Sequence, residues 1–270
     1  MKLTLNNGQQ IPQLGLGVYK VNQDIAVQLV GTAIDLGYRR IDTAALYDNE
    51  QEVGAAIRKS SVPREEIYVT TKIWNNRQGY HESKEAIEES LDRLNIGYVD
   101  MMLIHWPAPK QNKFVETWRA FEEVLEGGKI RGIGVANFNI HHLEQLLESA
   151  NVVPALNQVE LNPTFQQPEL RAFNTKHGIA TEAWAPLGRA KILDHPVLVE
   201  IAAAHGKSAA QVVIRWHLQI GNLVIPKSSN PDRLSENLDV FDFSLSDSDM
   251  QLIASMDTGI RASNNPDDFD

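Results

Sequence analysis

A repeated alternation of short apolar runs with amphipathic stretches constrains the fold of this chain more than any other feature. Eight apolar runs are centred near residues 16, 40, 69, 102, 132, 157, 181 and 224, and apolar residues recur at helical spacing between most of them. Strands that alternate with helices form parallel sheets, and eight strand–helix units close a barrel. We therefore predict an α/β protein folded as a single (β/α)8 TIM barrel, with residues 1–270 forming one domain.

An open, doubly wound sheet is the alternative architecture for such an alternation. That fold normally carries a G-x-G-x-x-G loop after its first strand, whereas this chain has only Gly15 and Gly17 at that place. No linker or shift in composition marks a second domain, and 270 residues suit one barrel. The barrel is therefore the favoured prediction.

Local signals sharpen this prediction at three places. Apolar runs flank Asn6–Gln9, and Asn-Gly between short apolar runs predicts a β-hairpin, which we expect to cap one end of the barrel. Asn49, with Glu52 three residues later, predicts a helix start with a capping box. Residues 258–270 have no periodic pattern, so we predict a C-terminal loop over the active-site face.

Four chemically active side chains fall at or just after the ends of predicted strands. Three of the apolar runs end on Asp42, Lys72 and His105, and Tyr47 follows Asp42 by five residues. Parallel α/β barrels place their chemistry at the carboxyl ends of their strands. We therefore expect these four side chains to meet in one pocket.

This set of side chains suits the reduction of a carbonyl to an alcohol, which needs a hydride and a proton. Tyr47 is the candidate acid; a free tyrosine has a pKa of about 10, and the ammonium of Lys72 could lower that value. Asp42 would pair with Lys72, and His105 would orient the substrate oxygen. Each residue also has a structural interpretation: Tyr47 as a packing residue, Asp42 and Lys72 as a plain ion pair, and His105 as a hydrogen-bonded core histidine.

Several other functions are disfavoured by what the sequence lacks. The chain has no cysteine, which excludes disulfides, thiolate metal sites and a cysteine nucleophile. We expect no metal, because no H-E-x-x-H or similar ligand spacing occurs, and there is no G-x-S-x-G motif. The net charge of −10 disfavours non-specific nucleic-acid binding. No apolar run reaches the roughly 18 residues of a membrane span and no secretory signal begins the chain, so we expect a cytoplasmic protein without a membrane partner.

Four segments resemble signature sequences of the aldo-keto reductase family: Ile41–Glu50, Thr71–Trp74, Leu103–Pro107 and Ile225–Ser228. The resemblance extends over nearly the whole chain, with the segments in the family's order. It implies an eight-stranded barrel capped by an N-terminal hairpin, and an enzyme that reduces aldehydes and ketones. It also implies that Tyr47 donates the proton, that Lys72 and Asp42 tune it, and that His105 orients the carbonyl.

The resemblance further implies NADPH, bound in an extended form at the carboxyl end of the barrel. The positions that match the family's nicotinamide and pyrophosphate contacts are Asn137, Gln158, Trp184, Leu187 and Gly188. Those that match the 2′-phosphate and adenine contacts are Lys227, Ser228, Asn230, Arg233, Glu236 and Asn237. A helix that starts at Pro231 favours an anion there, and Lys227 and Arg233 supply the positive charge that a 2′-phosphate needs.

Three positions depart from the family's usual residues. Ala136 stands in place of a serine, which removes one expected hydrogen bond to the carboxamide. Trp184 replaces a commoner tyrosine and should still stack on the nicotinamide. Asn230 stands where close relatives often have arginine, so we expect NADPH to be preferred and NADH to be used at lower efficiency.

Within the family, the chain is most similar to the bacterial 2,5-diketo-D-gluconic acid reductases, through Ala185–Gly188, Arg215–Gln219 and Glu236–Phe243. This resemblance implies reduction of 2,5-diketo-D-gluconic acid to 2-keto-L-gulonic acid by a monomer. Tyr19, Trp74, His105 and Trp106 would line the substrate pocket together with the C-terminal tail. Two alternatives stay open: a general reductase that detoxifies methylglyoxal and other aldehydes, and a non-catalytic nucleotide-binding protein on the same fold.

Overall fold

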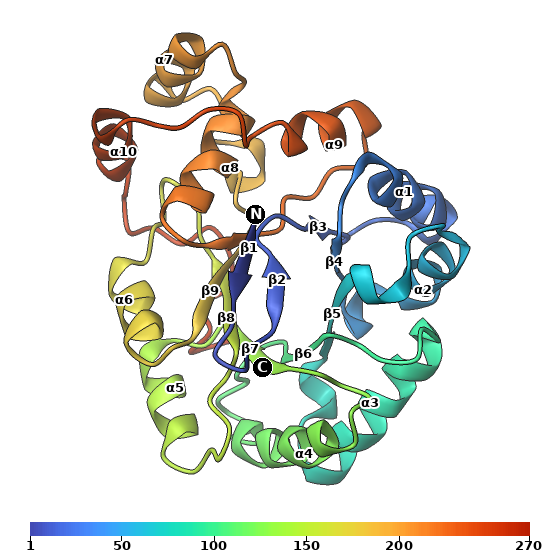
Figure 1. Ribbon diagram of the computed structural model, residues 1–270. Helices are drawn as coiled ribbons and strands as arrows, with labels where there is room; N and C mark the ends of the chain where they lie inside the picture. The colour runs from blue at the N-terminus through green and yellow to red at the C-terminus, as the bar shows by residue number, and fades with distance from the viewer.

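The computed structural model describes all 270 residues and shows eight parallel strands curled into a barrel, with helices around it (Figure 1). The strands follow one another around the barrel in chain order. They are β3 (Leu16–Gly17), β4 (Arg40–Asp42), β5 (Tyr68–Ile73), β6 (Met101–Ile104), β7 (Ile133–Ala136), β8 (Leu156–Glu160), β9 (Ala180–Trp184) and β10 (Leu223–Val224).

The barrel closes between its first and last strands. The backbone N–H of Val224 donates to the carbonyl of Gln13 at 2.8 Å, and the N–H of Gly15 donates to the carbonyl of Val224 at 2.9 Å. The sheet therefore has no free edge here, whereas an open doubly wound sheet would have two. The predicted barrel is confirmed, and the alternative architecture is wrong.

Ten α-helices cover the outside of the barrel. They are α1 (Gln23–Leu36), α2 (Glu50–Lys59), α3 (Tyr80–Leu94), α4 (Phe114–Glu126), α5 (Ile140–Leu147), α6 (Pro168–Lys176), α7 (Pro196–His205), α8 (Ala209–Gln219), α9 (Pro231–Leu238) and α10 (Asp247–Ala254). Helices α7 and α10 are additional to the repeat and contact each other. The sequence analysis did not predict α10. No single helix is long and apolar enough to cross a membrane; α7 and α8 pass that test only as a pair bent by 89°.

The N-terminal hairpin covers the amino end of the barrel, as predicted. It consists of β1 (Lys2–Thr4) and β2 (Gln10–Pro12), which pair antiparallel and cross the centre of the barrel in Figure 1. Its side chains Leu5 and Ile11 are buried in one apolar cluster with interior residues of the barrel: Tyr68, Met101, Leu103, Ala136, Ala155, Leu156 and Leu223. The hairpin is therefore an apolar plug.

The barrel interior becomes polar toward the other end. Alternate residues of a strand face opposite sides, so Tyr68 and Lys72 face inward from β5, and Arg40 and Asp42 face inward from β4. The intervening Ile41 and Val69 pack outward against the helices, in a cluster of 53 buried side chains. Gly15 leaves room for the inner layer, since a Cβ there would lie 2.4 Å from Arg40 Nε.

One local prediction is wrong in part. Asn49 precedes α2 as predicted, but it forms no capping box with Glu52. Its side chain instead donates to the carbonyl groups of Val18 and Val21 at 3.0 and 3.2 Å, and its Oδ1 accepts from Thr43 Oγ1 at 2.7 Å. Asn49 therefore joins the β3 and β4 loops beside the site.

Candidate active site

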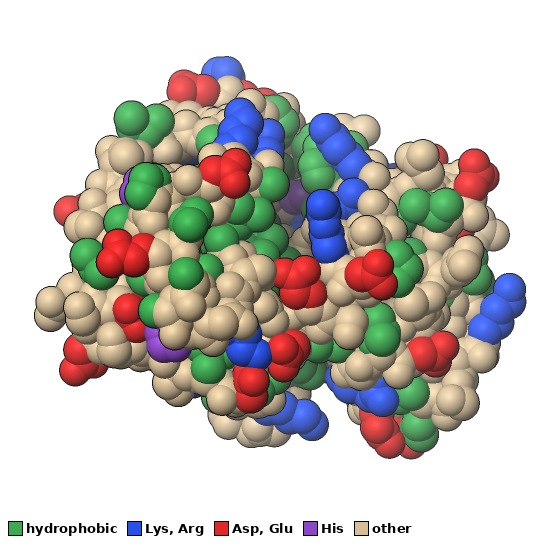
Figure 2. All heavy atoms as spheres, turned by 90° about the horizontal axis from the view of Figure 1, so that it is seen from above, with side chains coloured by type: hydrophobic (Ala, Val, Ile, Leu, Met, Phe, Trp, Pro, Cys, Tyr) green, Lys and Arg blue, Asp and Glu red, His purple; other side chains and the backbone are tan.

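The carboxyl ends of the strands surround a cavity of about 1130 Å³. Every residue predicted to contact cofactor or substrate lines it, except Gly188. Of the four predicted catalytic residues, only Lys72 does not line the cavity, because it is fully buried behind the others. Seen from above, the surface is hollowed between two masses, and Lys and Arg side chains stand along the rim of the hollow (Figure 2).

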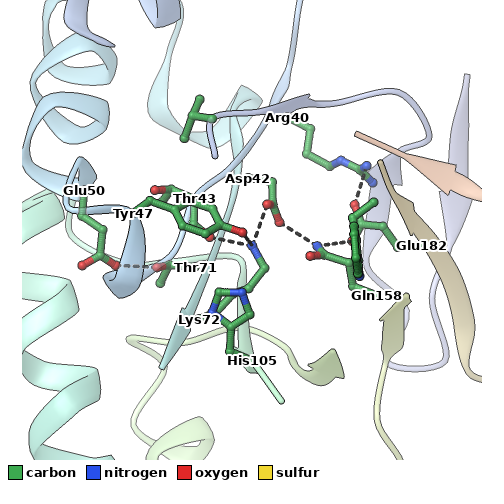
Figure 3. A network of polar contacts seen from close by, with 12 residues as sticks. Arg40, Asp42, Thr43, Tyr47, Glu50, Thr71, Lys72, His105, Gln158 and Glu182 are labelled. Atoms are coloured by element: carbon green, nitrogen blue, oxygen red, sulfur yellow. Dashed lines mark hydrogen bonds and ion pairs between the residues drawn. The ribbon is translucent and has the colours of Figure 1, made fainter. Parts of the chain in front are cut away.

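Lys72 is the centre of the buried polar network. Its ammonium has three acceptors: Asp42 Oδ1 at 2.6 Å, the carbonyl of Thr43 at 2.8 Å and the hydroxyl of Tyr47 at 3.5 Å (Figure 3). Burial favours the neutral amine, but the negative charge of Asp42 and the contact with Tyr47 outweigh it, so the pKa of Lys72 is raised. The ammonium therefore persists at neutral pH.

Tyr47 ends the short helical turn η1 (Ala45–Tyr47), which brings its hydroxyl to the cavity. Burial raises the pKa of Tyr47 to about 12, and Lys72 opposes this rise only in part. The expectation of a lowered pKa is therefore wrong, because the loss of hydration outweighs the nearby ammonium. Tyr47 keeps its proton at neutral pH, as a proton donor must.

His105 follows β6 and is buried against two other rings. Its centroid lies 5.0 Å from that of Trp74 and 5.6 Å from that of Tyr47. Burial and the charge of Lys72 lower the pKa of His105 well below its ordinary value, so the ring is neutral. Nδ1 has no hydrogen-bond partner in the protein. A neutral imidazole has one N–H, so His105 can donate a hydrogen bond to a substrate oxygen.

Two amide side chains, Gln158 and Asn137, lie beside the catalytic residues, and some of their donors and acceptors already have partners within the protein. Gln158 Nε2 donates to Asp42 Oδ2 at 2.8 Å and to Glu182 Oε2 at 3.3 Å. Asn137 Nδ2 donates to a backbone carbonyl at 2.9 Å, and its Oδ1 accepts from Trp184 Nε1 at 2.8 Å. The carbonyl oxygen of Gln158 and one N–H of Asn137 therefore have no protein partner.

Basic side chains line another part of the cavity. The predicted Lys227 and Arg233 do so, and so do Lys20 and Arg189, which the sequence analysis missed. The Oδ1 atom of Asn230 caps α9 by accepting from two N–H groups of its first turn, at 2.8 and 3.4 Å. Four cations around one cavity, in a protein of net charge −10, suit an anionic ligand.

Aromatic rings wall the part of the cavity next to Tyr47. The Tyr19 ring lies 5.0 Å from that of Tyr47, and the rings of Trp106 and Trp74 lie 4.6 and 6.1 Å from that of Phe269. Phe269 belongs to the C-terminal tail, so the tail covers this face as predicted. Such walls suit a small carbonyl compound.

Asp267 ties this tail to the start of α5. Its Oδ1 accepts from Asn139 Nδ2 at 2.6 Å and lies 3.2 Å from His141 Nε2 and 3.6 Å from His142 Nε2. By distance alone the two histidines and Asp267 could hold a metal. However, the backbone N–H of Asn139 donates to His142 Nδ1 at 3.2 Å, so neutral His142 carries its proton on Nε2. That nitrogen is a donor, and the cluster is better described as a hydrogen-bonded latch.

The chain belongs to the aldo/keto reductase family, whose model matches residues 12–258. It is 52% identical over 268 residues to an aldo-keto reductase of Mycolicibacterium smegmatis, covering 99% of this chain and 98% of that protein. It is 49% identical to the glyoxal reductase of Bacillus subtilis, covering 98% of this chain and 96% of that protein.

A solved structure of the same fold agrees. The crystal structure of a Gox0644 variant in complex with NADPH matches with a TM-score of 0.96 and 45% identity, covering 100% of this chain and 98% of that one. The predicted family and the predicted class, an oxidoreductase, are confirmed. The special closeness to 2,5-diketo-D-gluconic acid reductases is not shown by these comparisons.

Proposed function

We propose that this protein is an NADPH-dependent reductase that converts aldehyde and ketone carbonyls to alcohols, with small dicarbonyl compounds as its favoured substrates. The observation that supports this best is the Tyr47 hydroxyl, which lies at the cavity beside an aromatic wall and 3.5 Å from the Lys72 ammonium. The similarity to a glyoxal reductase favours dicarbonyls.

In this proposal the catalytic residues handle the proton and the substrate oxygen. Bound NADPH supplies the hydride. Tyr47 donates its proton to the carbonyl oxygen as negative charge develops there, and the ammonium of Lys72 stabilises the phenolate that remains. Asp42 holds Lys72 in place, and neutral His105 donates a hydrogen bond that orients the carbonyl.

The amide side chains fit the nicotinamide carboxamide. A primary carboxamide offers one carbonyl acceptor and two N–H donors, and the uncommitted groups here are the Gln158 carbonyl and one Asn137 N–H. These are complementary, even with Ala136 in place of the usual serine. Trp184, half-buried at the cavity, supplies a ring for stacking, and Leu187 and Gly188 belong to the loop over the pyrophosphate.

The cations fit the phosphates of NADPH, the cofactor in the Gox0644 complex. Lys227, Ser228 and Arg233 hold the 2′-phosphate, with Asn230 as their neighbour, and Glu236 and Asn237 contact the adenine. The Asn230 oxygen already caps α9 and cannot supply the positive charge of an arginine. NADH is therefore used at lower efficiency rather than excluded.

A second candidate substrate is 2,5-diketo-D-gluconic acid, reduced to 2-keto-L-gulonic acid. One observation favours it: the exposed cation Lys20 lines the cavity, with its Nζ 5.3 Å from the centre of the Tyr19 ring. A carboxylate at the mouth could pair with this ammonium. The aromatic wall favours the uncharged dicarbonyls.

The deciding experiment follows NADPH consumption by the purified protein with methylglyoxal, glyoxal and 2,5-diketo-D-gluconate side by side. Higher kcat/KM for the dicarbonyl aldehydes supports the first substrate class, and a strong preference for the sugar acid that Lys20→Met removes supports the second. Tight NADPH binding without turnover of any carbonyl would favour a non-catalytic nucleotide-binding protein.

We further propose that residues 1–270 work as one domain and as a monomer, in the cytoplasm, without a metal, nucleic acid or membrane partner. Measuring mass by light scattering and activity after chelation tests the oligomeric state and the metal. A dimeric mass, or loss of activity on chelation that zinc restores, would contradict this.

A further inference from the structure

Gln158 is the only side chain that links the catalytic carboxylate to a second buried carboxylate. Both hydrogens of its Nε2 are used, one on Asp42 Oδ2 at 2.8 Å and one on Glu182 Oε2 at 3.3 Å (Figure 3). An ionised carboxylate can only accept, so the amide cannot turn its oxygen toward this pair. Two acceptors in different directions also fix the plane of the amide, which one acceptor would leave free to rotate.

Glu182 does not touch the catalytic side chains Tyr47, Lys72 or His105, and it was not predicted as a site residue. It lies fully buried on β9, and its Oε1 is 2.6 Å from Nη2 of Arg40, which extends into the barrel interior from β4. Arg40 also donates to the carbonyl of Val224 at 3.1 Å. The two charges therefore neutralise each other within the barrel.

This ion pair is costly as a packing element. The Nε and Nη1 atoms of Arg40 are buried without a hydrogen-bond partner. Apolar residues of similar volume often replace a buried ion pair with no loss of stability, or with a gain. Stability alone therefore does not explain why these two inward positions carry charged side chains. The orientation of Gln158 does explain one of them, because it requires a hydrogen-bond acceptor at residue 182.

We propose that Glu182, neutralised by Arg40, is a positioning residue that fixes the amide of Gln158 so that its carbonyl oxygen faces the cavity as an acceptor. This rests on the proposed function, because the group that the carbonyl receives is an N–H of the nicotinamide carboxamide. Glu182 acts by positioning Gln158, and its own contacts are with Gln158 and Arg40.

The test uses two double variants that differ only in the acceptor at residue 182. Arg40→Met/Glu182→Gln removes the charges but keeps a carbonyl that can accept from Gln158, whereas Arg40→Met/Glu182→Met removes both. Each is titrated with NADP⁺ and with its 3-acetylpyridine analogue, in which a methyl group replaces the carboxamide NH2. The readout is the ratio of the two dissociation constants, measured by quenching of tryptophan fluorescence.

We expect the wild type and the Met/Gln variant to prefer NADP⁺ by a similar ratio. The Met/Met variant should lose about three- to tenfold of that preference, the typical effect of one well-placed hydrogen bond. A ratio that is unchanged in the Met/Met variant overturns the proposal. A merely structural pair would alter the melting temperature or both affinities equally, but not the ratio.

Two further outcomes separate this inference from the proposed function. A wild type that binds NADP⁺ and reduces carbonyls, but binds the analogue equally well, overturns the role of Gln158 and Glu182 and leaves the reductase intact. A wild type without NADP⁺ binding contradicts the proposed function itself.

If the Met/Met variant does not fold, the side-chain amide of Gln158 in the wild type decides the question by NMR. We expect both Nε2 protons to exchange slowly with solvent. Rapid exchange of the proton directed toward Glu182 would overturn the proposal.

Discussion

The two ends of the barrel are formed by the same strands but differ in chemistry. At the amino end, Leu5 and Ile11 of the hairpin join an apolar cluster inside the barrel. At the carboxyl end, Asp42, Tyr47 and His105 line an open cavity. Stability and chemistry are therefore separated along one axis, so that changes at one end should leave the other largely unaffected.

The strongest test of this separation is removal of the Tyr47 hydroxyl. Tyr47→Phe should lower kcat for carbonyl reduction by about 10²- to 10⁴-fold, the usual contribution of a general acid. The melting temperature and the affinity for NADPH should stay close to those of the wild type, because the ring remains. Steady-state kinetics, thermal unfolding and fluorescence titration measure the three quantities.

Tyr80→Phe is the matched control, since the Tyr80 hydroxyl hydrogen-bonds to Glu123 on the outside of the barrel. It should leave kcat unchanged. If Tyr47→Phe weakened NADPH binding and turnover equally, Tyr47 would be a binding or structural residue rather than the acid.

A substitution in the apolar plug should have the opposite effect to Tyr47→Phe and lower stability without affecting catalysis. Ile11 is fully buried, so Ile11→Ala should lower the free energy of unfolding by about 2–5 kcal/mol through lost burial and a residual cavity. Folded Ile11→Ala should retain the wild-type kcat/KM. Urea unfolding measures the free energy of unfolding, and initial rates of NADPH consumption measure kcat/KM.

The exposed Ile25 on α1 offers the control, because Ile25→Ala should change stability little. A large loss of kcat/KM in folded Ile11→Ala would show that the plug and the cavity are coupled and would break the comparison.

The fold and most of the site could be predicted because both depend on patterns along the chain. The strands are short and separated by helical periods, and Asp42, Lys72 and His105 fall at or next to strand ends, where a parallel barrel gathers them. The missed helix α10 had a signal, since Ser246 with Asp249 three residues later forms a capping box.

Other features depend on contacts that one sequence does not reveal. Arg40 and Glu182 are charged residues within strands that a barrel buries, which marks each as needing a partner, but residues 142 positions apart (182 − 40) cannot be matched without the fold. The direction of the Tyr47 pKa shift failed for a related reason. The nearby ammonium was predicted, but the depth of burial that outweighs it is a tertiary property.

Acid pH should lower the free energy of unfolding of the whole barrel. The groups responsible are buried histidines that belong neither to the plug nor to the catalytic group. Burial lowers the pKa of His217 to about 3 and that of His142 to about 4, against about 6.5 in an unfolded chain. The unfolded state therefore binds more protons in this window, so stability falls as the pH falls below about 6.5. At pH 5, roughly 1.5 units below that value, each histidine should cost about 2 kcal/mol.

Urea unfolding at neutral and acid pH measures this loss. His217→Gln should reduce the difference between the two pH values by about half, whereas the exposed His81→Gln should leave it unchanged. If the wild type and His217→Gln showed the same dependence on pH, His217 would not be buried in its neutral form.

The smallest expected effect concerns the tail, where the carboxyl end is closed by surface contacts rather than by a core. Asp267→Ala removes the acceptor for Asn139 Nδ2, so the tail should hold Phe269 against Trp106 less firmly. Loss of one partly exposed hydrogen bond costs about 1 kcal/mol, so KM for the carbonyl substrate should rise about fivefold. The NADPH affinity, kcat and free energy of unfolding should change little.

Asp268→Ala is the matched control in the same tail, because the Asp268 side chain hydrogen-bonds only to the nearby Asn265. It should leave KM unchanged. A rise in KM for both variants would mean that tail charge, rather than the latch to α5, governs substrate binding. Unchanged KM in Asp267→Ala would instead mean that the tail is held without the latch, by the aromatic contacts of Phe269 together with the hydrogen bonds that Asp268 and Asp270 accept from Lys110.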